Sequence, residues 1–128
     1  MNARLHSTIL LVMLLAGTVA GCQTQDEGPA ADSDTGIIVS AVFDLADSTS
    51  DPERFNSMFT QTSVPTDQQR EEYRIVALTP DFESVHSDGD FATVDVTVRN
   101  QVGDELAQVQ WKFAKVDGQW KIEHAPLE

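Results

Sequence analysis

The sequence predicts an α+β domain in which N-terminal helices pack on a curved, antiparallel, four-stranded meander. Between residues 37 and 59, apolar side chains recur at the spacing of one helix face. From Tyr73 onward they alternate with polar side chains, which is the period of a strand with one buried face. Helices therefore precede strands, and the chain of 128 residues has room for one small domain, over residues 37–128.

The first predicted element is a helix that begins near residue 37, with Asp34 or Thr35 as its N-cap. Three consecutive β-branched residues at 37–39 leave a strand open as an alternative. The apolar face of the helix consists of Ile37, Ile38, Ala41, Val42 and Leu45.

Two further helices are indicated by their start signals. Asp51 and Pro52 are an N-cap and a first helical residue, and Phe55, Met58 and Phe59 then share one face. Thr66 and Gln69 have the spacing of a capping box, which predicts one more short helical turn.

The turn of the last hairpin predicts the register of its two strands. Asp117 and Gly118 favour a two-residue type I′ turn, and the strands on either side alternate in phase with it. This register predicts four cross-strand pairs, which are Val116 with Gln119, Phe113 with Ile122, Lys112 with Glu123, and Trp111 with His124.

The first hairpin of the sheet is predicted around "HSDGDF", residues 86–91. A three-residue loop over residues 87–89 sets Phe82 opposite Val94, whereas a two-residue loop opposes Phe82 with Asp95. The three-residue loop is therefore expected.

The order of elements and the ending "FAKVDGQWKIEHAPL", residues 113–127, resemble small bacterial lipoproteins of the nuclear transport factor 2-like superfamily. This resemblance implies a nuclear transport factor 2-like or cystatin-like cone, in which the sheet wraps the helices around a cavity for small apolar ligands or peptides. The superfamily also holds isomerases and dehydratases, so the resemblance alone leaves an enzyme open.

The residues expected to line such a cavity are Tyr73, Trp111, Phe113, Ile122 and His124. Tyr73 is alternatively a core residue at the start of a strand, with its hydroxyl reaching solvent, and His124 a packed residue at the sheet edge. Asp95 alternates out of phase with the apolar face and is expected on the solvent side, while His86 lies beside a turn and is expected to be exposed. No residue is assigned a catalytic role.

The first 21 residues have the layout of a secretory signal peptide: Arg4, an apolar run at residues 8–16 and then small residues. The apolar run is too short for a permanent transmembrane helix. "VAGC", residues 19–22, resembles the lipobox of bacterial lipoproteins, in which the cysteine is lipidated; the alternative is an ordinary signal peptide with a cysteine nearby by chance. Cys22 is the only cysteine, so no disulfide and no cysteine-based metal site is expected.

Residues 22–36 contain several acids with Gly, Pro and Ala and no Val, Ile, Leu or aromatic residue, which predicts a disordered tether behind the lipidated Cys22. The lipoprotein resemblance implies attachment to a cell membrane, outside the cytoplasm. Because Gln23 rather than Asp follows the cysteine, it favours the outer membrane facing the periplasm, if the source has one.

The formal net charge of −13 excludes nucleic acid and anionic lipid surfaces as partners and permits a basic one. Cofactor and metal motifs are missing from the sequence, including phosphate loops, nucleophile elbows and paired histidines, so neither a cofactor nor a metal is expected.

We therefore expect a non-catalytic ligand- or protein-binding module anchored by lipid in the cell envelope, with an isomerase- or dehydratase-like enzyme as the alternative. The resemblance also leaves open a homodimer through the outer face of the sheet, where a polar, uncharged surface would consist of Thr93, Thr97, Gln108 and Gln110.

Overall fold

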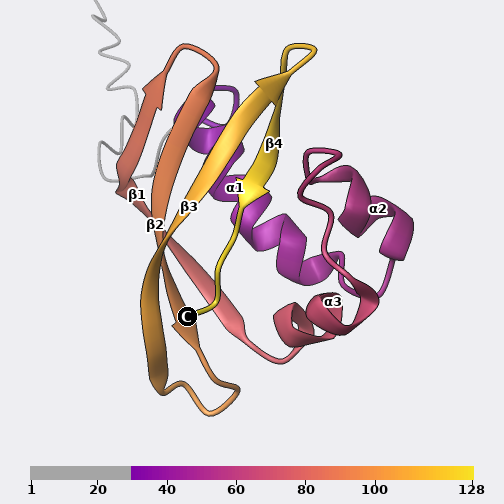
Figure 1. Cartoon of the computed structure of the whole chain (residues 1–128). Coiled ribbons are helices and arrows are strands. Elements are labelled where there is room, and N and C mark those ends of the chain that lie inside the picture. The colour runs from indigo at the N-terminus through magenta and orange to yellow at the C-terminus, as the bar shows by residue number, and fades with distance from the viewer. Residues whose placement is uncertain (1–29) are drawn as a thin grey trace, which may run out of the picture.

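The computed structural model describes residues 30–128 and shows three helices followed by four strands (Figure 1). The helices are α1 (Asp34–Asp47), α2 (Pro52–Ser57) and α3 (Asp67–Arg74), and the strands are β1 (Ala77–Asp88), β2 (Phe91–Arg99), β3 (Glu105–Val116) and β4 (Gln119–His124). Neighbouring strands pair antiparallel in the order β1-β2-β3-β4. The prediction of an α+β domain with helices before a four-stranded antiparallel meander is confirmed.

The sheet is curved, and α1 packs along its inner side, with α2 and α3 on that same side (Figure 1). Among residues 30–128, no helix is long and apolar enough to cross a bilayer. The predicted signal peptide, Cys22 and most of the predicted tether lie outside the described residues.

Helix α1 begins three residues before the predicted domain start. Its N-cap is Ser33, whose hydroxyl accepts a hydrogen bond from the Gly36 amide at 3.0 Å, rather than Asp34 or Thr35. The strand alternative for residues 37–39 is thereby excluded. Ile38, Val42 and Leu45 are fully buried, whereas Ile37 is 41% exposed because it lies off the axis of that face.

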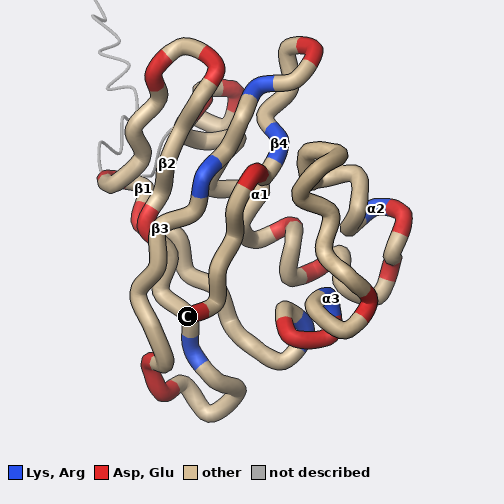
Figure 2. The backbone as a smooth tube through the Cα atoms, viewed as in Figure 1, with Lys and Arg blue, Asp and Glu red and all other residues tan. Residues whose placement is uncertain are grey.

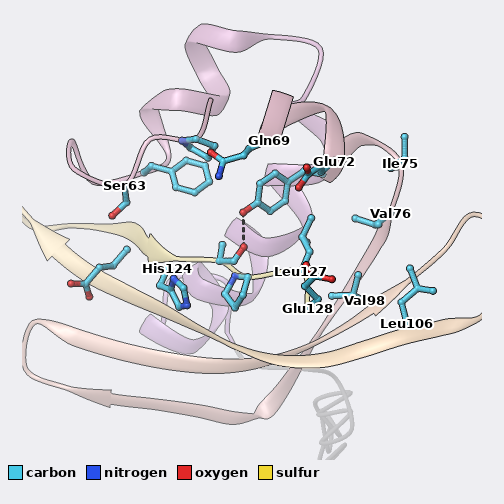
Figure 3. A pocket seen from close by; sticks show the side chains of 16 residues that line it. Ser63, Gln69, Glu72, Ile75, Val76, Val98, Leu106, His124, Leu127 and Glu128 are labelled. Carbon is cyan, nitrogen blue, oxygen red and sulfur yellow. Dashed lines mark hydrogen bonds between the residues drawn. The ribbon is translucent and has the colours of Figure 1, made fainter. Parts of the chain in front are cut away.

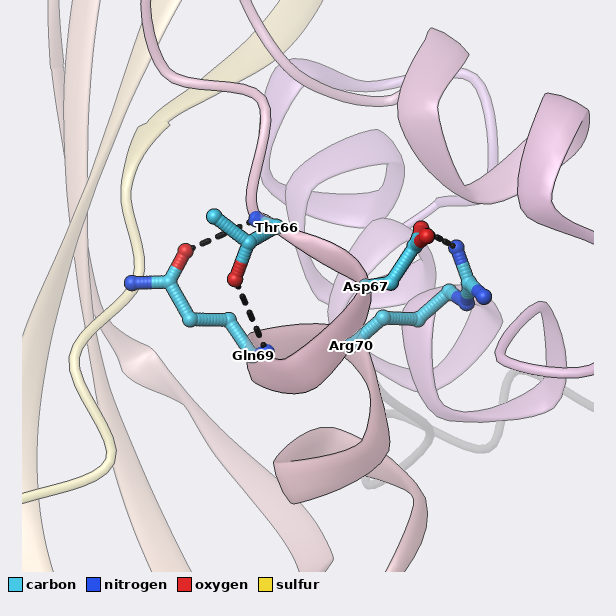
Figure 4. A network of polar contacts seen from close by, with 4 residues as sticks. All are labelled: Thr66, Asp67, Gln69 and Arg70. Atoms are coloured by element: carbon cyan, nitrogen blue, oxygen red, sulfur yellow. Dashed lines mark hydrogen bonds and ion pairs between the residues drawn. The ribbon is translucent and has the colours of Figure 1, made fainter.

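Helices α2 and α3 begin as their sequence signals predict. Asp51 caps α2, and Phe55 is buried below it. In the capping box of α3, the Gln69 amide donates to Thr66 Oγ1 at 3.2 Å and the Thr66 amide donates to Gln69 Oε1 at 2.8 Å (Figure 4). The helix continues past Tyr73, so the prediction that strand periodicity starts at this residue is wrong. Because Tyr73 follows Gln69 by four residues, it lies on the same helix face.

The β3–β4 hairpin has the predicted turn. Asp117 and Gly118 both have positive φ, at 51° and 77°, and Val116 pairs with Gln119 and Phe113 with Ile122. Beyond Phe113 the register shifts by one residue, and Lys112 pairs with His124. The predicted pairs of Lys112 with Glu123 and of Trp111 with His124 are therefore wrong, because Glu123 is an extra, unpaired residue of β4 between the two pairings.

The β1–β2 hairpin differs from its prediction. Its loop consists of Gly89 and Asp90, with Asp88 opposite Phe91, instead of residues 87–89. Residues 82–85 form a bulge between the paired positions Asp81 and His86, and Phe82 does not pair with Val94.

Side chains in and beside the bulge form hydrogen bonds with backbone groups that a regular ladder would otherwise pair. The Ser84 hydroxyl accepts a hydrogen bond from the Asp95 amide at 2.8 Å and donates to the Asp81 carbonyl oxygen at 2.6 Å. The Asp81 carboxylate accepts from the Glu83 amide at 3.0 Å. Side-chain groups thus take the place of lost ladder hydrogen bonds.

The core lies between α1 and the inner face of the sheet, and an aromatic cluster closes it at the side of α2 and α3. Phe55, Phe59, Tyr73 and Trp111 pack together in this cluster, with ring centroids 5.2 to 6.4 Å apart. Burial of each such side chain contributes about 1.5–3 kcal/mol.

The outer edge of β4 is covered by the chain that follows α2. The Ile122 amide donates to the Met58 carbonyl oxygen at 2.8 Å, and the Thr60 amide donates to the Ile122 carbonyl oxygen at 2.9 Å. This short parallel pairing covers the edge of β4 at Ile122.

Candidate functional site

A groove of about 770 Å³ opens between α3, the end of β4 and residues 125–128, and we call it the α3 groove (Figure 3). Its apolar walls come from the segment after α2, the turn after α3, the far ends of β2 and β3, and the C-terminal segment. Its polar side chains come from the loop before α3, from α3 itself, from the end of β4 and from the C-terminal segment. The walls include Phe59, Ile75, Val76, Val98, Leu106 and Leu127, and the polar side chains include Ser63, Gln69, Glu72, Glu123, His124 and Glu128.

Tyr73 lines the groove from the side of α3. Its phenol donates a hydrogen bond to the carbonyl oxygen of Ala125 at 2.5 Å, which the dashed line in Figure 3 marks. Burial and, to a smaller extent, the negative charge of Glu72 together raise the pKa of Tyr73 to about 12. The phenol therefore stays protonated at neutral pH and acts as a hydrogen-bond donor.

The C-terminal segment is held by a second buried donor. The indole Nε1 of Trp111 donates to the carbonyl oxygen of Pro126 at 2.9 Å, and the Trp111 side chain is fully buried. Two aromatic side chains, from α3 and β3, thus fix consecutive carbonyl groups of residues 125 and 126. This arrangement forms one wall of the groove.

The structure divides the five predicted cavity residues into two groups. Tyr73 and His124 line the α3 groove. Trp111, Phe113 and Ile122 are at most 1% exposed and lie in the core, because the space between sheet and helices is filled by the aromatic cluster.

The other residues considered from sequence lie away from the groove. Asp95 and His86 are exposed, as predicted, and neither lines it. The residues predicted for a dimer face lie together on the outer side of β2 and β3, where Thr97 pairs with Gln108.

Sequence reasoning missed the carboxylates of the groove: Glu72, Glu123 and Glu128. A signal for Glu72 was present in the capping box, because a helix continued from Thr66 carries Gln69, Glu72 and Tyr73 on adjoining positions of one face. Glu123 and Glu128 follow from the bulge in β4 and the path of the last residues, for which the sequence has no local signal.

A second, smaller hollow lies at the other end of the molecule, beside the start of α1. Trp120 Nε1 donates to Asp34 Oδ1 at 3.0 Å, and Lys115 Nζ lies 4.0 Å from that oxygen and 4.8 Å from the Trp120 ring centroid. These contacts join α1 to the last hairpin. Over the described part of the chain, no group of three or more His, Cys, Asp or Glu side chains is arranged to hold a metal ion.

Comparison with known proteins finds no protein-family model that matches the chain, and no curated protein with significant similarity to it. Function must therefore be inferred from the α3 groove and the side chains that line it.

Proposed function

We propose that this protein is a lipid-anchored binding module of the cell envelope, with a domain of the nuclear transport factor 2-like superfamily that takes a small apolar ligand in the α3 groove. The observation that carries the binding role is the groove itself. Its volume of about 770 Å³ lies within the range of small-molecule sites, and its lining combines apolar walls with polar side chains in similar measure. The superfamily assignment is supported by three helices packed on one side of a curved meander.

A binding role without catalysis is supported by the state of the groove's phenol. The proton of Tyr73 is already engaged by the Ala125 carbonyl oxygen, and its raised pKa disfavours proton transfer near neutral pH. The exposed His86 and Asp95 lie elsewhere on the sheet and do not converge on the groove.

Binding in the groove is tested by a matched pair of substitutions at the end of the β2–β3 hairpin. Leu106 lines the groove and is 57% exposed, whereas Val102 is 82% exposed and does not line it. Leu106→Asp should weaken binding of the probe naphthylmethanol roughly tenfold, because a charge replaces apolar contact, and Val102→Asp should leave binding unchanged. Equal affinities for the two variants would contradict a ligand site in this groove.

An isomerase- or dehydratase-like enzyme is the second candidate, because His124 lines the same groove as Glu72 and Glu123. Such an enzyme would remove a proton beside a carbonyl group of its substrate. Deuterium exchange into cyclohexanone that is accelerated by the wild-type chain, and not by His124→Gln, would favour the enzyme. A binding module accelerates exchange in neither form.

The anchor is tested at Cys22. A lipidated cysteine adds the mass of its acyl chains, and two or more chains give stable membrane attachment. Cys22→Ser should abolish the added mass and leave either uncleaved precursor or unanchored protein, as seen by intact-mass measurement and membrane fractionation. Wild-type mature protein without acyl mass would contradict the lipoprotein proposal.

A further inference from the structure

Part of β3 has a partner strand on one side only. Strand β4 pairs with residues 112–116 of β3 and ends at His124, whereas β2 pairs along residues 105–114 (Figure 1). Within residues 30–128, no backbone hydrogen bond joins residues 107–110 to the C-terminal segment or to any element other than β2. These residues therefore form an open sheet edge, which we call the free β3 edge (residues 107–110).

The backbone groups that point to this edge follow from a hydrogen bond farther along the strand. In an antiparallel ladder, the amide and carbonyl of one residue point to the same neighbouring strand, and those of the next residue point the opposite way. The Lys115 amide donates to the Asp90 carbonyl oxygen at 2.7 Å and so points toward β2. Because β3 has no extra residue between positions 107 and 116, Val109 also points to β2, and Gln108 and Gln110 point to the free β3 edge.

The other edges of the sheet carry features that discourage a further strand. Strand β1 contains Pro80, which has no amide hydrogen, and the bulge of residues 82–85. The edge of β4 is covered at Ile122 by the chain after α2. Residues 106–111 of β3 include no charge, proline or glycine, and Figure 2 shows them as a tan stretch of the strand. The free β3 edge thus lacks the usual protection of an edge strand.

Apolar side chains beside this edge remain partly exposed. Val96 and Val98 of β2 are at most 1% exposed. Their partners in β3, Val109 and Ala107, are only half-buried, although they point to the same face of the sheet. Trp111, the next residue of β3 on that face, is fully buried where the aromatic cluster and the C-terminal segment cover it. A strand added at the free β3 edge covers Val109 and Ala107 with side chains of its own.

We propose that the free β3 edge is a docking site for an extended peptide segment of a partner protein, which adds a strand to the sheet where β4 has ended. The backbone of this segment exchanges amide-to-carbonyl hydrogen bonds with Gln108 and Gln110. Its side chain between these two positions lies beside Val109, and the side chains at the two positions lie on the polar outer face. The partner segment therefore alternates apolar and polar residues.

This docking site goes beyond the proposed function and does not depend on it. The free β3 edge adjoins the α3 groove, since Leu106 lines that groove, but it binds through the backbone of β3. The small-ligand site instead uses side chains of the groove.

A second copy of the chain fits the free β3 edge less well than a peptide. Both copies carry a net charge of −13 and repel each other. Two edges as short as this one also bury too little surface to reach the roughly 1,200 Å² of a stable interface. An uncharged peptide segment meets no such repulsion, and a weak, reversible contact is sufficient for it.

The experiment uses the peptide acetyl-Val-Thr-Val-Thr-Val-amide and measures deuterium exchange of single backbone amides in the full chain, held in detergent micelles. Without peptide, the amides of Gln108 and Gln110 should exchange rapidly and that of Val109 slowly, because only Val109 donates to β2. The peptide should slow exchange at Gln108 and Gln110 and leave Val109 nearly unchanged. The peptide concentration that halves these exchange rates gives its dissociation constant.

Two N-methylated isomers of the peptide test whether its backbone pairs with β3. Methyl groups on both threonine nitrogens block the amides that face β3, and they should weaken binding roughly tenfold or more. Methyl groups on the second and third valine nitrogens lie on the far side of the added strand and should change the dissociation constant by no more than about twofold. The two isomers have the same side chains, so only the position of the lost donors differs.

A matched pair of variants tests the edge from the side of the protein. Gln108→Pro removes an outward amide but no hydrogen bond to β2, so the sheet should remain and the peptide should bind roughly tenfold more weakly. Gln108→Ala keeps the amide and should bind the peptide as the wild type does. Both variants lose the contact of the Gln108 side chain with Glu105 at 3.3 Å, so that contact cannot explain a difference. Slow exchange at Val109 shows that the ladder to β2 is intact.

Equal weakening by the two N-methyl patterns, or equal binding to the two Gln108 variants, overturns strand addition. So does the absence of protection at Gln108 and Gln110 at every peptide concentration. Protection that appears without peptide and grows with protein concentration assigns the edge to a second copy and likewise overturns the proposal. If Gln108→Pro does not fold, the N-methylated isomers decide the question with the wild-type chain. None of these outcomes bears on the small-ligand site, which naphthylmethanol tests separately.

Discussion

The phenol of Tyr73 in α3 donates a hydrogen bond to the carbonyl oxygen of Ala125, a residue 52 positions later in the chain. Tyr73 is 7% exposed, and Ala125 is buried as well, so this contact lies where water does not readily replace it. It ties a helix to the segment that follows the last strand, and it defines one side of the α3 groove.

Removal of this hydroxyl should destabilise the fold. Tyr73→Phe keeps the ring and its aromatic contacts but leaves a buried carbonyl oxygen without its donor, which costs about 1–3 kcal/mol. Urea denaturation of the variant measures the loss. Ser57→Ala is the control, because it removes an exposed hydroxyl-to-carbonyl bond to Arg54 and should cost much less. Equal losses in both variants would argue against a buried, water-free contact.

The same phenol makes stability fall at high pH. The pKa of Tyr73 rises from an ordinary value of 10.0 in the unfolded chain to about 12 in the folded protein. The phenol's contribution to the free energy of unfolding is therefore complete below pH 10 and is lost as the pH rises toward 12, by on the order of 2 kcal/mol.

This loss can be assigned to one residue, because the chain has a single tyrosine and its tyrosinate absorbance reports Tyr73 alone. Tyr73→Phe should remove the part of the alkaline destabilisation that follows this absorbance. If the wild-type absorbance titrates as it does in the unfolded chain, the buried hydrogen bond is absent in solution.

The turn of the β3–β4 hairpin depends on Gly118. Its φ of 77° disfavours a side chain, although a Cβ added there meets no atom within 4 Å. Gly118→Val should thus cost about 1–2 kcal/mol through backbone strain alone, seen as a lower Tm. Gln119→Val, at the neighbouring exposed position with ordinary strand geometry, is expected to change Tm little. Similar Tm values for the two variants would contradict the type I′ turn.

Two like charges face each other across β1 and β2, where Asp81 pairs with Asp95 on an exposed part of the sheet. Such pairs are destabilising, so Asp95→Thr should raise the free energy of unfolding by about 0.2–1 kcal/mol. The gain should decrease at high salt, where the repulsion is screened. Asp104→Thr removes an acid outside this pair, and a salt-dependent gain of the same size there would point to net charge instead.

The parts of the fold that could be predicted from sequence are those that local chemistry determines. Asp51 and Pro52, the capping box at Thr66 and Gln69, and the turn at Asp117 and Gly118 act over a few residues, and each is found where its pattern places it. The alternation in β2 also matches the burial, with Val94, Val96 and Val98 inside and Asp95 outside.

The registers that could not be predicted depend on distant partners. The bulge in β1 exists because the Ser84 hydroxyl binds the amide of Asp95 in another strand. The shift at His124 accompanies the contacts of Ala125 and Pro126 with Tyr73 and Trp111. No spacing within β1 or β4 encodes these contacts.

The candidate site, too, could be predicted only in part, because it depends on contacts between residues that are distant in the sequence. Alternation correctly places Trp111, Phe113 and Ile122 on the inner face, but it does not distinguish a cavity wall from a filled core. That distinction depends on the volumes of all side chains that meet there, including Phe55 and Phe59 from α2 and the residues that follow it.

The meander also has a kinetic consequence. Each strand pairs only with its neighbour in the chain, so the sheet forms by closing short loops, which costs little entropy. The hydrogen bond from Trp120 to Asp34 spans 86 residues, and it closes the largest loop among the side-chain hydrogen bonds of the described chain. We expect this contact to form after the rate-limiting step of folding, so that Trp120→Phe accelerates unfolding and leaves the refolding rate nearly unchanged. The contact between Trp120 and Asp34 would then form on an already folded sheet. It would determine the unfolding rate, and so the lifetime of the native state, rather than the folding rate.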